Sequence, residues 1–208
     1  MKVTFIKALA FSTLFLLLFA CSKQEDAFTE VYGTVYQAGT SHSKVVPNAL
    51  VEFQWRIPKT YGAETYFIDS VRADANGRFS ISAEVPDQNL HVFASAFHHY
   101  GGGELTMRSN VRRGINQKVN LDLIPYAWIR MHISSTGSYN RMSINSIVGS
   151  SRHYQFRAGS DTSLISAPVL GNRAVEINMF KYKWDLQETE QVWVQTIGHD
   201  TVDVYLSF

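Results

Sequence analysis

The chain has 208 residues, a formal net charge of +1, 45% hydrophobic residues, 13% aromatic residues and a single cysteine. A charge so close to neutral creates no long-range field toward polyanions, so we predict no nucleic-acid partner. One cysteine excludes disulfide staples and thiolate zinc sites, and we expect no metal or cofactor. The hydrophobic content is sufficient for ordinary packed cores.

The first 20 residues have the features of an export signal. Lys2 and Lys7 make a positively charged start, and the apolar run of residues 8–20 is too short to span a hydrocarbon core of about 30 Å. The run closes with Leu18-Phe19-Ala20-Cys21, which resembles the lipobox of bacterial lipoprotein signal peptides. The resemblance implies that residues 1–20 are removed and that Cys21 becomes the lipidated (palmitate-bearing) N-terminus.

Residues 21–28 are expected to form a lipidated tether. The charged stretch Ser22-Lys23-Gln24-Glu25-Asp26 resembles the acidic export signal of surface lipoproteins in Bacteroidetes-type bacteria. That resemblance implies a lipid-anchored protein on the cell-surface side of the outer membrane. A short solvated linker of a periplasm-facing lipoprotein would have the same composition, so both membrane faces stay open.

Apolar residues recur with period two from Val31 onward, which predicts an all-β protein of two consecutive β-sandwich domains, transthyretin-like and then Ig-like. Half-buried strands are expected in residues 51–57, 79–85, 119–123, 129–133 and 202–208. Turn residues separate them at Asp74-Ala75-Asn76-Gly77, Gly101-Gly102-Gly103, Thr136-Gly137 and Gly198-His199-Asp200.

Residues 29–125 resemble a carboxypeptidase regulatory-like domain. The segments that carry the resemblance are Val31-Tyr32-Gly33-Thr34-Val35, Val46-Pro47-Asn48-Ala49-Leu50-Val51, Ala73-Asp74-Ala75-Asn76-Gly77-Arg78-Phe79 and Val119-Asn120-Leu121-Asp122-Leu123. The resemblance implies a small transthyretin-like β-sandwich without catalytic residues. The chain departs from the pattern between Arg56 and Phe67, where an insertion rich in tyrosine and charge lengthens a connection, and at Gly101–Gly103.

The turn at Asp74 can be predicted from its residue types alone. Gly77 tolerates the positive φ that closes a tight hairpin, and the Asp74 carboxylate can accept backbone N–H groups across the turn. A calcium site on Asp74 and Asn76 is the weaker interpretation, because the following residues supply no further carboxylate ligand.

Residues 126–208 match no motif and are predicted to form the second, Ig-like sandwich after a short junction at Pro125-Tyr126. Its strands are expected in residues 128–133, 142–148, 154–157, 175–184, 192–197 and 202–208.

Histidines provide the nearest approach to a metal or catalytic site. His98 and His99 precede Glu104, but adjacent strand residues point to opposite faces, so surface or edge histidines are the simpler interpretation. His132, His153 and His199 lie far apart in sequence and have no nucleophile motif beside them. A Ser-His-Asp site could therefore be assembled only by the fold.

An aromatic strand is the best candidate for ligand binding. Phe180, Tyr182 and Trp184 share one face, and Trp193 follows across a turn. Aromatic faces beside carboxylates and amides suit sugar rings, so Tyr182, Trp184 and Trp193 are the candidate binding residues. The alternative is that these rings are core residues. Arg108, Arg112, Arg113 and Lys118 form a basic region that is either a solvated face or a docking edge.

These observations favour a non-enzymatic, membrane-anchored lipoprotein that acts as an accessory, structural or adhesive protein-interaction module at the cell envelope. Its expected partner is another outer-membrane protein. A glycan-binding surface lipoprotein that uses the exposed aromatic rings is the alternative. A hydrolase with a site assembled in space is the third possibility.

Overall fold

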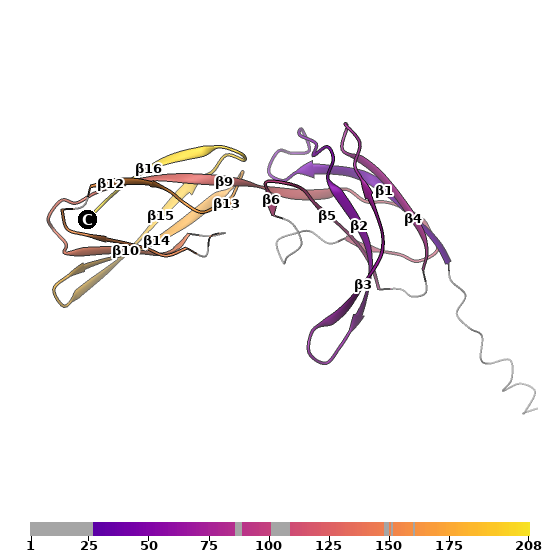
Figure 1. Cartoon of the computed structure of the whole chain (residues 1–208), viewed down its shortest axis with the longest axis horizontal. Helices are drawn as coiled ribbons and strands as arrows, with labels where there is room; N and C mark the ends of the chain where they lie inside the picture. Colours follow the sequence, from indigo (N-terminus) through magenta and orange to yellow (C-terminus); the bar gives the residue numbers. More distant parts are fainter. Residues whose placement is uncertain (1–26, 86–88, 101–108, 148–149, 151, 160) are drawn as a thin grey trace, which may run out of the picture.

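A computed structural model of the chain describes residues 27–85, 89–100, 109–147, 150, 152–159 and 161–208 (Figure 1). These residues form sixteen strands, which confirms the prediction of an all-β fold. No helix within the described ranges is long and apolar enough to cross a membrane. Cys21, the tether up to residue 26, Gly101–Gly103, Glu104 and Arg108 lie outside the described residues.

The strands are β1 (Ala27–Gln37), β2 (Leu50–Pro58), β3 (Ala63–Arg72), β4 (Arg78–Val85), β5 (Leu90–Ser95), β6 (His99–Tyr100), β7 (Ser109–Val111), β8 (Asn116–Lys118), β9 (Leu121–Ser134), β10 (Arg141–Ile147), β11 (Tyr154–Arg157), β12 (Thr162–Ile165), β13 (Val169–Leu170), β14 (Ala174–Lys183), β15 (Leu186–Gln195) and β16 (Thr201–Ser207).

The first lobe is a sandwich of two sheets. In one sheet β1 pairs antiparallel with β4 and parallel with β8 and the start of β9. The facing sheet has the order β3-β2-β5-β7. The side chains between them are mostly Val, Ile, Leu and Phe on alternate positions, as expected for half-buried strands. They include Val31, Val35, Val51, Phe53, Phe79, Ile81, Leu90, Val92, Leu121 and Leu123.

The second lobe is built on the continuation of β9. There β9 pairs antiparallel with β12 and β13 and parallel with β16. The facing sheet has the order β11-β10-β14-β15. A separate core fills the space between these sheets and includes Ile129, Met131, Ile133, Met142, Ile144, Val175, Ile177, Met179, Leu206 and Phe208.

Strand β9 therefore belongs to both lobes, and Figure 1 shows it running from one to the other. Leu121 and Leu123 point into the first core, and Ala127, Ile129, Met131 and Ile133 point into the second. The sequence predicts a short linker near Pro125-Tyr126, whereas the structure has an unbroken strand at that point.

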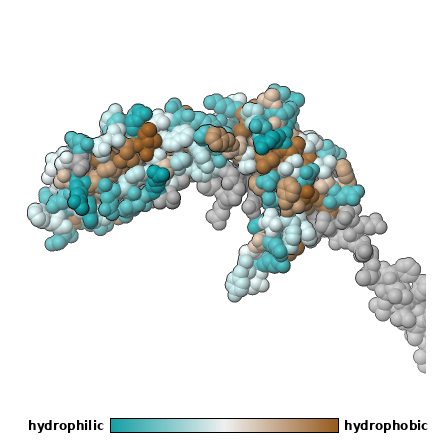
Figure 2. Space-filling view, viewed as in Figure 1, coloured by the Kyte–Doolittle hydropathy of each residue, from teal (hydrophilic) through white to brown (hydrophobic). Residues whose placement is uncertain are grey.

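The insertion between Arg56 and Phe67 is an extended hairpin. β2 and β3 pair from Leu50 opposite Arg72 out to Pro58 opposite Ala63, whereas β5 pairs with β2 only as far as Trp55. The outer part of the hairpin thus projects beyond its sheet, and it is mostly hydrophilic to neutral in hydropathy in Figure 2. Its exposed tip carries Tyr61.

Two glycine-containing segments of the first lobe have a clear physical role. An added Cβ on Gly33 would lie 1.7 Å from the Val119 carbonyl oxygen, so only glycine lets β1 approach that backbone. At the turn before β4, Gly77 has φ +70, and the Asp74 Oδ1 accepts the N–H groups of Asn76 and Arg78, both at 2.8 Å. The carboxylate cap predicted from the sequence is confirmed.

The second lobe differs from its predicted strands in two places. β15 begins at Leu186, six residues earlier than expected, and β12 and β13 were not predicted. The first half of β15 is a run of polar residues with no apolar alternation. The two missed strands have four and two residues, which is too short for a period to be visible.

Removing the Asp74 cap should destabilise the first lobe. In Asp74→Ala two backbone N–H groups lose a charged acceptor, and we expect a loss of about 1–2 kcal/mol in the free energy of unfolding. Urea denaturation monitored by tryptophan fluorescence measures it. Asp74→Asn, which keeps the acceptor oxygen, is the matched control and should lose less than half as much. Equal losses in the two variants would contradict the assignment of the cap.

Candidate functional site

The aromatic strand predicted from the sequence lies at the outside of the second lobe. Val175, Ile177 and Met179 of β14 are buried. The even-numbered residues of the strand, which include Phe180 and Tyr182, therefore point away from the core. In the register of β14 with β15, Trp193 lies opposite Glu176 and therefore points to the same side. We call this surface the β14–β15 face.

Trp184 is in the two-residue turn that joins β14 to β15, with φ +51 and 82% of its surface exposed. Trp193 is 63% exposed near the other end of the hairpin. At about 3.4 Å per residue, the two indoles are separated by more than 20 Å of strand. Tyr182, Trp184 and Trp193 thus share one hairpin but are spread along it, and whether they bind a ligand stays a prediction.

The neighbours of these rings on the β14–β15 face are polar. The Arg141 guanidinium of β10 lies over the Tyr182 ring, 4.3 Å from its centroid. Gln191 donates a hydrogen bond to Asn178 at 3.1 Å. Half-buried rings beside guanidinium and amide groups form a flat surface that can stack on a ligand and hydrogen-bond it at its edges.

Near its turn, the inner side of the same hairpin carries charged groups in place of apolar ones. Lys181 makes an ion pair with Glu190 at 2.5 Å, and Tyr139 donates a hydrogen bond to Glu188 at 2.5 Å. The hydrogen bond with Glu188 raises the pKa of the Tyr139 hydroxyl. These paired groups hold the outer half of β15 against β14.

A second aromatic surface, which the sequence reasoning missed, lies on the outer side of β9. Its alternate residues Tyr126, Trp128, Arg130 and His132 point away from the core, and we call them the β9 face. At the junction end, the His98 ring lies 6.4 Å from Tyr126 and 6.1 Å from Trp128, between centroids.

Further rings extend the β9 face at both ends. Phe97 is 85% exposed and contacts His98 with a centroid separation of 3.9 Å. At the other end Tyr205, 79% exposed, stacks on His132 at 4.6 Å with an interplanar angle of 14°. The signal for this face is present in the sequence, because aromatic and charged residues alternate with Ala127, Ile129 and Met131.

His132 also meets a serine and an aspartate. Its Nε2 donates a hydrogen bond to Asp203 at 2.7 Å, and Ser163 Oγ lies 3.3 Å from its Nδ1. The hydrogen bond from His132 and the guanidinium of Arg130 hold the pKa of Asp203 below its usual value. The three side chains stand in the order of a Ser-His-Asp triad, from three different strands.

The surroundings of these three residues do not favour acyl-transfer chemistry. β9 is paired with β12 on one side and with β16 on the other, so its backbone N–H groups are engaged in the sheet and cannot serve as oxyanion donors. Tyr205 covers one face of the imidazole, and Arg130 competes for the carboxylate. The arrangement is a hydrogen-bonded surface cluster.

His98 and His99 separate at the junction. His98 has φ +58 and is exposed, whereas His99 is buried with 9% of its surface exposed. Its Nδ1 donates to the Phe97 carbonyl at 2.9 Å, and its ring lies 4.7 Å from that of His199. Within the described ranges no group of three His, Cys, Asp or Glu side chains could hold a metal ion.

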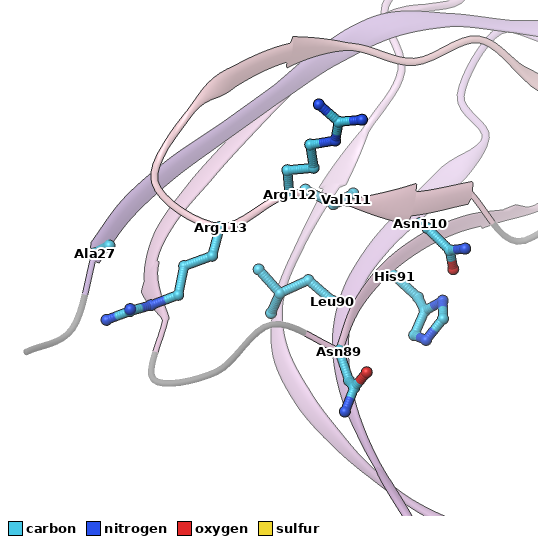
Figure 3. A pocket seen from close by; sticks show the side chains of 8 residues that line it. All are labelled: Ala27, Asn89, Leu90, His91, Asn110, Val111, Arg112 and Arg113. Atoms are coloured by element: carbon cyan, nitrogen blue, oxygen red, sulfur yellow. The ribbon is translucent and has the colours of Figure 1, made fainter. Parts of the chain in front are cut away.

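The basic region predicted near Arg112 borders a surface pocket of about 500 Å³ (Figure 3). Arg112 and Arg113 extend in different directions, while Asn89, His91 and Asn110 gather on the other side of Leu90. Arg113 Nε donates to the Val85 carbonyl at 2.9 Å. The polar groups do not converge on one point, so this pocket is a weak candidate for a binding site.

Comparison with known proteins gives no family assignment. No protein-family model matches the chain, and no curated protein matches it. Among solved structures, it is similar to GBS52, the minor pilin of Streptococcus agalactiae, with 6% identity over 86% of this chain and 94% of that chain and a TM-score of 0.43.

Two further solved structures are similar at lower scores. The shaft pilin SpaA of Lactobacillus rhamnosus GG has 6% identity over 88% of this chain and 97% of that chain, with a TM-score of 0.31. The TIE protein of Bacillus anthracis has 8% identity over 87% of this chain and a TM-score of 0.34, and the chain spans about a third (34%) of its length. With TM-scores below 0.5, none of these proteins indicates a function for this chain.

The stability of the protein should depend on pH through His99. Burial lowers the pKa of this imidazole, so the folded protein binds fewer protons than the unfolded chain, in which His titrates near 6.5. The stabilising contribution of His99 to the free energy of unfolding is complete above pH 6.5 and is lost as the pH falls below 6.5. We expect the free energy of unfolding to decrease from pH 7 to pH 5, measured by urea denaturation.

Two variants identify the source of this pH dependence. His99→Gln should reduce the slope of the profile between pH 5 and 7, with the remainder coming from His199, whose pKa burial also lowers, whereas His153→Gln, which removes an exposed imidazole, is the control. A wild-type profile that is flat in this window would show that His99 does not titrate differently in the two states.

Proposed function

We propose that the chain is a non-enzymatic module, anchored in a bacterial outer membrane through a lipid on Cys21, that acts by binding another envelope protein along its exposed sheet edges. The observation that carries the proposal is the pair of long edge strands, one in each lobe. Among the described residues, β3 pairs only with β2 and β15 pairs only with β14.

Each of these edges offers a row of backbone groups over ten residues. An edge strand presents unpaired N–H and C=O groups that can pair with a strand of another chain. β15 is exposed over most of its length. Inward-pointing charges such as Glu188 and Glu190 limit the pairing of an edge strand with arbitrary strands of other chains. They therefore support a selective partner for β15.

The sequence upstream of β1 supports an anchored position. Residues 22–26 separate Cys21 from Ala27, the first residue of β1. Five extended residues span at most about 20 Å, so a lipidated Cys21 would hold the first lobe close to the membrane surface.

Replacement of the anchor residue should release the protein from the membrane. In Cys21→Ala no acyl chain can be attached, and each buried acyl methylene contributes about 0.8 kcal/mol to membrane binding. We expect loss of fatty-acid labelling and a shift from the membrane to the soluble fraction. Ser22→Ala is the control and should remain acylated. Membrane recovery of Cys21→Ala equal to that of wild type would contradict the anchor.

Photo-crosslinking in intact cells tests the edge contact. A photoreactive residue at Thr189 on β15 or Ser70 on β3 should yield one discrete adduct, identified by mass spectrometry, and the adduct should weaken in the Cys21→Ala background. The same residue at Ala158, in an exposed turn, is the control. Adducts equally frequent at all three positions, or at none, would argue against edge binding.

Glycan binding is the second candidate function, and the β9 face favours it. Tyr126 and Trp128 follow each other along one strand, and the guanidinium of Arg130, which has five N–H donors, lies beyond them on the same face. Alternate residues of a strand lie about 7 Å apart, so the face extends over roughly 20 Å, which suits an extended saccharide stacking on successive rings.

Tryptophan fluorescence tests the glycan function with soluble oligosaccharides. If the β9 face binds them, saturable quenching should weaken at least about threefold in Trp128→Ala and should persist in Trp184→Ala. The opposite result would place the site on the β14–β15 face. If no oligosaccharide of a broad panel changes the fluorescence of the wild type, the glycan function is wrong.

A further inference from the structure

The junction between the lobes contains a pocket of about 340 Å³ whose polar lining has no carboxylate. Gln37, Asn48 and Arg72 line it from the first lobe, His99 from β6, which pairs with β9 at Pro125, and His199 from the second lobe. Apolar side chains from residues 45–47 and 96–97 complete the wall. We call it the junction pocket.

The charges around the junction pocket are predominantly positive. Arg72 is part of the wall. Burial lowers the pKa values of His99 and His199, and the charge of His98 lowers both further, with Lys44 adding to the effect on His199. Asp122 forms an ion pair with His42 at 3.4 Å, and the carboxylate of Asp200, next to His199 in the chain, accepts the N–H of Thr201 at 2.7 Å.

One polar atom of the pocket wall lacks a partner. His99 Nδ1 donates to Phe97, but His99 Nε2 is buried and has no hydrogen-bond partner among the described residues. A buried polar atom without a partner costs about 1–3 kcal/mol, and such atoms are frequent at binding sites. When His99 is protonated, the buried Nε2 becomes a second donor, and a shift of the ring toward the pocket would let an anion satisfy both its charge and its hydrogen bond.

We propose that the junction pocket binds a small oxyanion, either a phosphate or a carboxylate, through Arg72, His99 and His199. Because Arg72 belongs to the first lobe and His199 to the second, the bound anion would connect the first sandwich directly to the second. Binding requires proton uptake by the imidazoles, so it strengthens as the pH falls. This function is independent of the partner and glycan functions proposed above.

NMR titration of the histidine rings in the folded protein tests the proposal. The probes are sulfate, whose charge is constant between pH 5.5 and 7.5, inorganic phosphate and glutarate, each compared with chloride at matched ionic strength. We expect saturable shifts of the His99 and His199 resonances, with half-saturation at about tenfold lower concentration at pH 5.5 than at pH 7.5. A response to glutarate alone would identify a carboxylate ligand, and a response to phosphate alone would identify a phosphate ligand.

Variants separate a specific site from general salt effects. Arg72→Gln and His199→Gln, both at exposed residues, should weaken binding at least fivefold while the protein stays folded. Arg112→Gln, at an exposed arginine outside the pocket, should bind as wild type does. The proposal is overturned if no probe gives saturable shifts beyond those of chloride, or if Arg112→Gln weakens binding as much as Arg72→Gln.

Discussion

The structure depends on one strand that two cores share. β9 contributes Leu121 and Leu123 to the first core and Ile129 and Met131 to the second, without leaving the strand conformation. Pro125 marks the exchange of partners: β1 pairs with β9 up to Leu123, the short β6 pairs with it at Ile124 and Pro125, β13 from Tyr126 and β16 from Trp128. Because proline has no N–H to donate, β9 loses the fewest backbone hydrogen bonds by exchanging its neighbouring strands at this residue.

Close contacts beside Pro125 fix the angle between the lobes. Asn172, with φ +57, donates through Nδ2 to the Ala38 carbonyl of the first lobe at 2.9 Å and accepts the Gly198 N–H at 2.7 Å. An added Cβ on Gly198 would lie 2.5 Å from the Pro125 ring. The shared strand and these close contacts make the two sandwiches one extended body.

The strand pattern could be predicted wherever one face is buried and the other solvated. The alternation of Val175, Ile177 and Met179 placed β14 to within a residue at each end, and the Asp74 turn was predicted down to its carboxylate. The first half of β15 could not be predicted, because its polar residues 187–191 show no apolar alternation. Pairing with β14 and the ion pair of Lys181 with Glu190 hold them in place.

The candidate sites were harder to predict, because they depend on which segments the fold brings together. Ser163, His132 and Asp203 come from three strands whose adjacency follows only from the pairing around β9. The contact of His99 with His199 likewise joins β6 to the loop before β16, two segments far apart in the sequence. By contrast, Tyr126 and Trp128 were visible as the solvent-facing half of an alternating pattern, and their exposure could have been inferred from the buried residues between them.

The direction of β1 has a mechanical consequence for an anchored protein. Its first residue is the end nearest Cys21, and the strand runs antiparallel to β4 and parallel to β8 and β9. A pull from the membrane side would load the hydrogen bonds of these ladders in shear, all at once, whereas a pull across the strands would open them one by one. The first lobe thus resists tension applied along β1, the direction in which the proposed anchor at Cys21 would be pulled.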